Sequence, residues 1–265
     1  MSCTIHAYWI IIKKMVKKIK EQLTSYHVEA VIFDLDGVIT NSATVHAFAW
    51  KKLFDEFLEE NNYLDTGQEL FNIESDYSTY VDGKMRMHGI DSFLGSRGIS
   101  LPLGRESDVG MRTQYGLSNL KNTFFRKVIN ETGVVLFNDA IECIKKISKK
   151  NIPIAVASSS KNCIFLLEKA GISDVFQVIV EGNYVSEHKM KSKPEPDIFI
   201  EASRLLKVDV RNSAVIEDAI SGIKSAVSAG IGSVIAVDRN KSGKLNLKGV
   251  SQVVSTLKEV DFFNY

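Results

Sequence analysis

Short apolar segments alternate with helical patterns along most of this 265-residue chain. The segments that predict strands are rich in apolar or β-branched residues and lie at 28–33, 152–157, 175–180, 214–216, 233–237 and 252–254. Helical patterns separate the later ones, at 140–149, 162–170, 197–206 and 219–229. Strands that alternate with helices favour a parallel sheet covered by helices on both faces. The sequence therefore predicts an α/β core.

Residues 44–133 break this alternation, because they carry helix signals and no clear strand. The first helical stretch is marked by residues at helical spacing, namely His46, Trp50, Leu53, Phe54, Phe57 and Leu58. A second stretch runs from about residue 117 to residue 130. We therefore expect an N-terminal basic extension at 1–27, a core made of 28–43 and 134–265, and a helical domain inserted at 44–133.

The extension has a short apolar run at 8–12, followed by a cluster of lysines at 13–20. A secretory signal carries its basic residues before the apolar stretch, and a membrane span needs about 20 apolar residues, so neither description fits. Met15, Val16, Ile19 and Leu23 would form the apolar stripe of a short basic helix, which leaves membrane-surface docking as an alternative. We expect a solvated extension.

The net charge of +1 gives no signal for nucleic acid or a membrane surface. Three cysteines, Cys3, Cys143 and Cys163, are widely spaced and form no CxxC or Cys/His ligand pattern. This usage is typical of reduced thiols, so we expect a cytoplasmic protein.

The most informative segment is Asp34-Leu35-Asp36-Gly37-Val38, which directly follows the first predicted strand. Ligands of an open α/β sheet bind beyond the carboxyl ends of its strands, and Gly37 permits a turn that aims both carboxylates there. One carboxylate would attack phosphorus, and the other would act as general acid and base. A simple strand-capping turn or a calcium loop is the alternative, although the further ligands of such a loop are missing.

Three later segments follow strand signals in the same way. Ser158 ends the second strand, Lys193 precedes a helix whose start Pro194 favours, and Glu217-Asp218 ends the fourth strand. A hydroxyl binds phosphate oxygens, a lysine neutralises their charge, and paired acids bind Mg²⁺. Each alone is also typical of a loop serine, a solvated lysine or a helix N-cap. Their joint occurrence, each in the same relation to a strand, indicates one phosphate and metal site.

These segments resemble the four signature motifs of the haloacid dehalogenase superfamily, and within it the sequence is similar to the β-phosphoglucomutase group. The resembling segments are FDLDGVIT, His46-x-x-x-Trp50, ASSSKN, SKPEPDIF and EDAISGIKSA. The resemblance covers nearly all of the chain from residue 28 on, apart from a less recognisable cap. It implies a Rossmann-like parallel-sheet core with an inserted α-helical cap domain, and Mg²⁺ as cofactor.

The resemblance also implies roles for single residues. Asp34 is the nucleophile and a metal ligand, and Asp36 is the general acid/base that offers its backbone carbonyl to the metal. Glu217 and Asp218 belong to the metal shell, Asp218 most directly.

Phosphate binding is implied for a second group of residues. Ser158 and Lys193 hold the transferring phosphate, whereas Ser160, Lys161 and Asn162 match positions that grip the second, non-reacting phosphate of a mutase substrate.

In the cap, His46 matches a hinge-side residue that helps position the acid/base. Lys84 and Arg86 are candidate phosphate or sugar contacts with a solvated basic loop as the alternative, and Lys121 resembles a cap lysine near the substrate or is purely structural. The sequence departs from the group at Asn41-Ser42, where the mutases more often carry Asp-Thr. The cap sets specificity, so the identity of the sugar stays open.

We expect phosphoryl transfer through an aspartyl-phosphate on a small sugar phosphate, with a phosphatase as the alternative because Asp34 and Asp36 serve both reactions. Dehalogenation is disfavoured, since it needs no metal and no acid at Asp36. A non-catalytic scaffold is disfavoured by the complete motif set. The expected partner is a small phosphorylated molecule rather than nucleic acid or membrane, and we expect a monomer or weak dimer.

Overall fold

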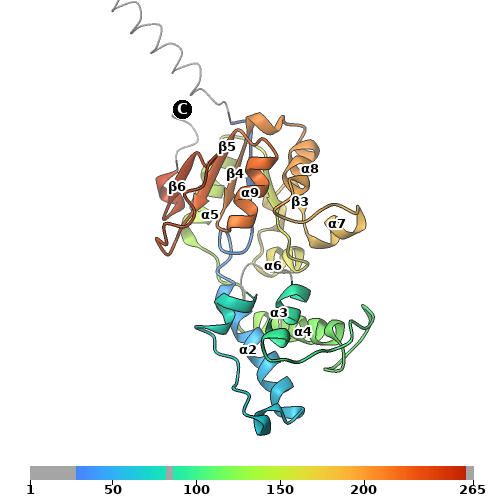
Figure 1. Cartoon of the computed structure of the whole chain (residues 1–265). Helices are drawn as coiled ribbons and strands as arrows, with labels where there is room; N and C mark the ends of the chain where they lie inside the picture. The colour runs from blue at the N-terminus through green and yellow to red at the C-terminus, as the bar shows by residue number, and fades with distance from the viewer. Residues whose placement is uncertain (1–27, 82–85, 261–265) are drawn as a thin grey trace, which may run out of the picture. The chain divides into compact units, whose positions relative to one another are not determined.

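The computed structural model describes residues 28–81 and 86–260 (Figure 1). Six strands form one sheet in the spatial order β3-β2-β1-β4-β5-β6. Their bounds are β1 (Ala30–Phe33), β2 (Ile154–Ala157), β3 (Val178–Val180), β4 (Ser213–Glu217), β5 (Ser233–Val237) and β6 (Gln252–Val254). Every neighbouring pair is parallel. The predicted α/β fold with a parallel sheet is confirmed.

The centre of the sheet explains why its sequence is so apolar. All four residues of β1 are buried, as expected for a strand covered on both faces. Phe33 lies opposite Val156 of β2 and Ile216 of β4. Asp34, the next residue, therefore lies at the same end of the sheet as Ala157 of β2 and Glu217 of β4. The strand order also switches sides at β1: β2 and β3 lie on one side of β1, and β4, β5 and β6 lie on the other. Open α/β sheets bind their ligands at such a switch point.

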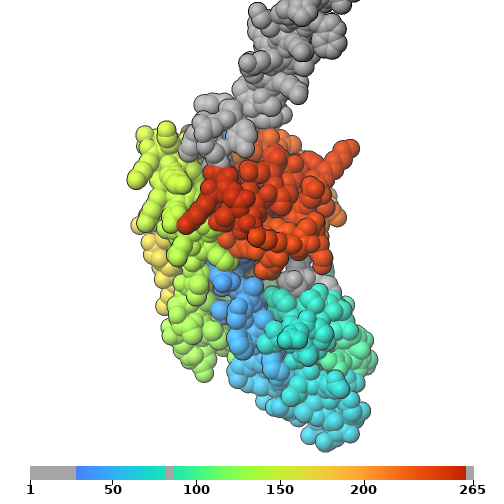
Figure 2. Space-filling view, turned by 90° about the vertical axis from the view of Figure 1, so that its left-hand side faces the viewer, coloured from blue at the N-terminus to red at the C-terminus, as the bar shows by residue number. Residues whose placement is uncertain are grey.

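The helices from residue 138 on are α5 (Asn138–Ser148), α6 (Cys163–Lys169), α7 (Gly182–Glu187), α8 (Asp197–Leu206) and α9 (Ile220–Ser228). Helix α8 buries Ile198, Phe199 and Ala202 in the same apolar cluster as Ile32 of β1. Figure 2 shows the red C-terminal segment against yellow-green α5, which the short 3-10 helix η5 (Leu257–Glu259) contacts.

One local prediction was wrong, and one short helix was missed. The third strand is shorter than predicted, because Ser173–Val175 forms a 3-10 turn before β3 begins. Helix α7 was not predicted, because six residues are too few for a clear apolar period. It begins where the Glu181 side chain accepts hydrogen bonds from the backbone N–H groups of Asn183 and Tyr184.

The described residues form two compact units. One contains the sheet and comprises the described residues up to Ile39, Phe137–Phe165 and those from Ile172 on; the other comprises Thr40–Leu136 and Leu166–Gly171. The main helices of the second unit are α2 (Ala43–Glu60), α3 (Arg86–Ser96) and α4 (Gln114–Thr132). Its core is rich in aromatic residues, with Phe54 against the rings of Trp50, Phe71 and Phe93. The boundaries expected for an inserted cap, 44–133, remain our proposal.

Among the described residues, Cys143 and Cys163 are buried free thiols. None of the helices within 28–81 and 86–260 has the length and apolar character needed to cross a membrane. Cys3 and the predicted basic extension at 1–27 lie outside the described residues.

Candidate active site

Lys193 joins the carboxyl ends of three strands. Its ammonium donates to Asp34 Oδ1 at 2.6 Å, to Glu217 Oε1 at 2.6 Å and to the carbonyl of Ala157 at 2.9 Å. An ammonium has three donors, and all three are used here. The Lys193 side chain is only 7% exposed, so these contacts form away from bulk water. The sequence prediction that Asp34, Lys193 and Glu217 meet at one end of the sheet agrees with this geometry.

Both oxygens of Glu217 are engaged. Oε1 accepts from Lys193, and Oε2 accepts from the backbone N–H groups of Asp218 and Ala219. The side chain lies against Gly222 of α9, where an added Cβ would be 1.7 Å from Oε1. Glu217 thus positions Lys193 and the start of α9, and it is less available as a direct metal ligand than the resemblance implied.

Asp218 differs from Glu217, because no hydrogen bond or ion pair to its carboxylate is formed within the described part of the chain. Its carboxylate lies against Gly37, where an added Cβ would be 1.7 Å from Oδ2. Gly37 has φ +84°, a conformation that favours glycine. The turn after β1, which Gly37 was predicted to permit, therefore brings the Gly37 backbone close to the Asp218 carboxylate.

The electrostatics of the cluster reflect an excess of acidic groups. Burial raises the pKa of Asp34 to about 7, with Lys193 opposing the rise and Glu217 adding to it. Burial, followed by Glu217 and Asp34, raises the pKa of Asp218 well above its usual range. Burial disfavours the charged form of Lys193, but Asp34 and Glu217 outweigh it and raise the pKa of this lysine. One ammonium thus faces several carboxylates, and a further cation would stabilise their ionised forms.

The donor set fits a hard divalent cation. Asp34, Glu217 and Asp218 each offer a carboxylate oxygen, and these atoms all lie within 4.8 Å of one another. Mg²⁺ prefers such oxygen ligands and is bound by one or two carboxylates plus water and phosphate. The residues present therefore match the requirements of a magnesium site.

The loop after β2 carries the predicted phosphate-binding residues. Ser158 is 2% exposed, and its hydroxyl accepts from the backbone N–H of Ser160. The hydroxyl of Ser160 accepts in turn from the N–H of Asn162, which is also buried. Lys161 is exposed at the same turn. The structure thus places all four residues in one compact turn beside the Lys193 contact to Ala157.

The helical unit holds three of the predicted cap residues. Lys121 is 2% exposed, and its ammonium lies 2.7 Å from His46 Nδ1. The same ammonium lies over the rings of Trp50 and Phe125, at 5.2 and 5.0 Å. Burial, then Lys121 and Arg86, lowers the pKa of His46 well below its usual range, so its neutral ring accepts a hydrogen bond from Lys121.

Arg86, at the start of α3, donates to the carbonyl of Ser118 at 3.2 Å and to Asn122 Oδ1 at 3.1 Å. The structure therefore brings Arg86, His46 and Lys121 into one basic cluster between α2, α3 and α4. Lys84 lies outside the described residues.

Sequence reasoning did not find every residue at this end of the sheet. The carbonyl of Ala157 carries no side-chain signal. Asp238 and Arg239 directly follow β5, in the relation to a strand that singled out Asp34 and Glu217, yet neither was predicted. The same rule applied to the fifth strand would have found them.

A family model described as haloacid dehalogenase-like hydrolase matches residues 28–230, most of the chain. A β-phosphoglucomutase of Mycobacterium bovis is 36% identical over 240 residues, which cover 88% of this chain and 91% of that protein. A β-phosphoglucomutase of Bacillus subtilis is 31% identical over 204 residues, 77% of this chain and 80% of that protein. A crystal structure of β-phosphoglucomutase from Clostridium difficile superposes with a TM-score of 0.66 at 27% identity, covering 89% and 94% of the two chains.

The sheet, the Asp34–Lys193–Glu217–Asp218 cluster and these matches agree with one another. The chain belongs to the haloacid dehalogenase-like hydrolase family, as a phosphotransferase or phosphatase enzyme similar to the β-phosphoglucomutases.

Proposed function

We propose that this protein catalyses Mg²⁺-dependent phosphoryl transfer on a small sugar phosphate, in the manner of a β-phosphoglucomutase. The observation that carries the proposal is the contact of Asp34 with Lys193 at 2.6 Å, next to Glu217 and Asp218, in a chain similar to β-phosphoglucomutases over most of its length.

In the proposed reaction, Asp34 attacks one phosphorus of a sugar bisphosphate, and the phosphorus–oxygen bond to the sugar breaks, which leaves an aspartyl-phosphate and a sugar monophosphate. Asp36 gives its proton to the departing sugar oxygen. For the return step, Asp36 takes the proton from a free hydroxyl of another sugar monophosphate, which attacks the aspartyl-phosphate, frees Asp34 and forms the bisphosphate again. Lys193 offsets the charge on Asp34 and on the phosphoryl oxygens.

Mg²⁺, when bound, would neutralise charge on the transferring phosphoryl group. Asp34 and Asp218 would hold it through their carboxylates, and Asp36 through its backbone carbonyl. Glu217 would support the site without binding Mg²⁺ directly, because its oxygens already bond Lys193 and the start of α9.

The remaining predicted residues would recognise the substrate. Ser158 would bind the transferring phosphate, while Ser160, Lys161 and Asn162 would bind the second one. The basic cluster of the helical unit, His46, Arg86 and Lys121, together with Lys84, would set the sugar specificity.

A phosphatase remains the second candidate, because the matching family is described as a hydrolase family. Its first half-reaction is the same, with water in place of the second sugar hydroxyl. The two functions differ only in the group that accepts the phosphoryl group from Asp34.

The test is to supply β-glucose 1-phosphate with Mg²⁺ and a trace of glucose 1,6-bisphosphate, and to measure glucose 6-phosphate and free phosphate together. We expect glucose 6-phosphate to form, and Asp34→Asn to lower kcat by at least about 10³-fold because the nucleophile is removed. Free phosphate without glucose 6-phosphate would support the phosphatase instead. If Asp34→Asn formed the wild-type products at the wild-type rate, both candidate functions would be refuted.

A further inference from the structure

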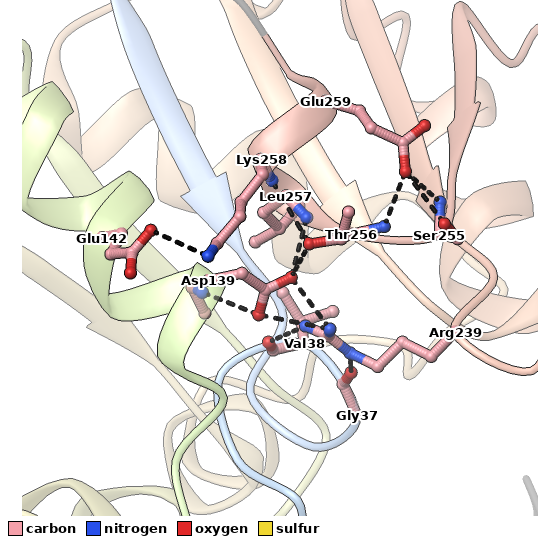
Figure 3. A network of polar contacts seen from close by, with 11 residues as sticks. Gly37, Val38, Asp139, Glu142, Arg239, Ser255, Thr256, Leu257, Lys258 and Glu259 are labelled. Atoms are coloured by element: carbon pink, nitrogen blue, oxygen red, sulfur yellow. Dashed lines mark hydrogen bonds and ion pairs between the residues drawn. The ribbon is translucent and has the colours of Figure 1, made fainter.

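Arg239, two residues after β5, makes a fork of hydrogen bonds to the turn that follows the first strand (Figure 3). Its Nε donates to the carbonyl of Gly37 at 2.9 Å, and its Nη2 donates to the carbonyl of Val38 at 2.9 Å. Its Nη1 contacts both carboxylate oxygens of Asp139, at 3.2 and 3.0 Å. One guanidinium thus spans an acid of α5 and two consecutive carbonyls of the DxDGV segment.

Asp139 is itself held in place from three sides. Its Oδ1 accepts from the backbone N–H of Ala140, and its Oδ2 accepts from the hydroxyl of Thr256 at 2.7 Å and the N–H of Leu257 at 2.8 Å. Against the effect of burial, the hydrogen bonds from Arg239, Thr256 and Leu257 lower the pKa of Asp139 to about 2, so it is ionised at neutral pH. Asp139 therefore presents a fixed anion to Arg239.

The guanidinium also lies over an aromatic ring. The Arg239 carbon Cζ is 3.6 Å from the centre of the Phe137 ring, and the backbone N–H of Phe137 donates to the carbonyl of Ile39. The side chain of Arg239 is 19% exposed and that of Asp139 is 10% exposed. Arg239 is thus enclosed by both segments that it joins, 37–39 and 137–139.

The two carbonyls that Arg239 binds belong to the part of the chain that shapes the candidate active site. Gly37 directly follows Asp36, and its backbone lies against the carboxylate of Asp218. A shift of the Gly37–Val38 peptide would therefore move Asp36 and separate the Gly37 backbone from the Asp218 carboxylate.

We propose that Arg239 is a positioning residue, which fixes the Gly37–Val38 backbone through its pairing with Asp139 and so sets the placement of Asp36 and the metal-binding carboxylates. This inference rests on the proposed function and deepens it. Arginine is required, because its planar fork of fixed donors reaches Asp139 and both carbonyls at once, whereas the compact ammonium of a lysine cannot.

The test compares Arg239→Lys with Arg97→Lys. Arg97 is a matched control in the helical unit, since it pairs with Asp76 at 3.1 Å, lies over the Phe93 ring at 5.1 Å and is 18% exposed. Both variants lose one partly buried arginine pair, but only Arg239→Lys loses contacts to the DxDGV backbone. We measure kcat, KM, and the Mg²⁺ concentration that gives half of the Mg²⁺-induced rise in melting temperature.

For Arg239→Lys we expect kcat to fall about 10- to 100-fold with little change in KM, as for a small misplacement of reacting groups. We expect the half-saturating Mg²⁺ concentration to rise about 10-fold, as for loss of a residue that orients metal ligands. Arg97→Lys should leave both quantities at the wild-type values. A purely structural role would lower the melting temperature without changing either quantity at temperatures where the protein is folded.

The proposal is overturned if kcat of Arg239→Lys falls no further than that of Arg97→Lys, or if its half-saturating Mg²⁺ concentration is unchanged. Should Arg239→Lys fail to fold, Asp139→Asn is held to the same two criteria, because it weakens the same fork from the other side. If the wild-type protein turns over no sugar phosphate, the proposed function fails, and the Mg²⁺ titration alone then decides the role of Arg239.

Discussion

Gly37 combines a left-handed backbone conformation with a close approach to the carboxylate of Asp218. A Cβ at this position would lie 1.7 Å from Asp218 Oδ2, and φ is +84°. Gly67 offers a control, because its φ is +85° and an added Cβ meets nothing within 4 Å. The two glycines share the backbone strain of a substitution and differ in the steric conflict.

We therefore predict that Gly37→Ala lowers kcat at least about 10-fold, because the new methyl group pushes the Asp218 carboxylate away. Gly67→Ala should cost about 1–2 kcal/mol of stability, from left-handed backbone strain alone, and leave kcat unchanged. Steady-state kinetics and urea unfolding measure the two effects. Equal kcat values for the two variants would show that Asp218 tolerates the displacement.

At the scale of elements, α9 is tied to the end of β4 by Glu217. The Glu217 carboxylate accepts from the N–H groups of Asp218 and Ala219, and it needs the space that Gly222 leaves open. The same carboxylate forms the buried ion pair with Lys193. One glycine in α9 thus allows the helix to begin on an acid that also orients the lysine.

We predict that Gly222→Ala destabilises the protein by about 3 kcal/mol, because it breaks a buried ion pair. Gly95→Ala is the matched control in α3, where an added Cβ meets nothing within 4 Å. It should be neutral or stabilising by up to about 1 kcal/mol, since alanine favours a helix more than glycine. Urea unfolding curves measure both changes. A Gly222→Ala protein as stable as Gly95→Ala would mean that Glu217 can move without loss.

For the whole molecule, the acidic cluster links stability to metal binding. Without a cation, Asp34, Glu217 and Asp218 lie close together with Lys193 as their shared counter-charge. Binding of Mg²⁺ to the folded state alone would stabilise it by about 2.7 kcal/mol at a concentration of 100 times Kd.

We predict that the order of melting temperatures reverses with Mg²⁺. In EDTA, Asp218→Asn should melt a few degrees above the wild-type protein, because the substitution removes one repelling carboxylate. In Mg²⁺, the variant should melt below the wild-type protein, because it has lost a metal ligand. Asp91→Asn, an exposed acid of α3, should respond to Mg²⁺ as the wild-type protein does. Differential scanning calorimetry in the two buffers measures the order, and an equal Mg²⁺ response of Asp218→Asn and wild type would rule out Asp218 as a ligand.

The sequence allowed much of this molecule to be predicted. Runs of apolar and β-branched residues identified the six strands, and the bounds of α8 agree with the predicted helix at 197–206. The misses were short or weakly patterned elements, such as α7 and the first turn before β3, in which few residues carry the period.

By itself, the sequence determined the fold class and the positions of Asp34, Ser158, Lys193 and Glu217, because each lies next to a strand or helix signal along the chain. Only the tertiary structure decided that Glu217 faces inward to Lys193, and that Arg239 binds the backbone of Gly37 from 202 residues away. The physical reason is that hydrophobic periodicity is a local property of the chain. The partners of a buried charge depend on how distant segments of the chain pack together, and local sequence patterns do not encode this packing.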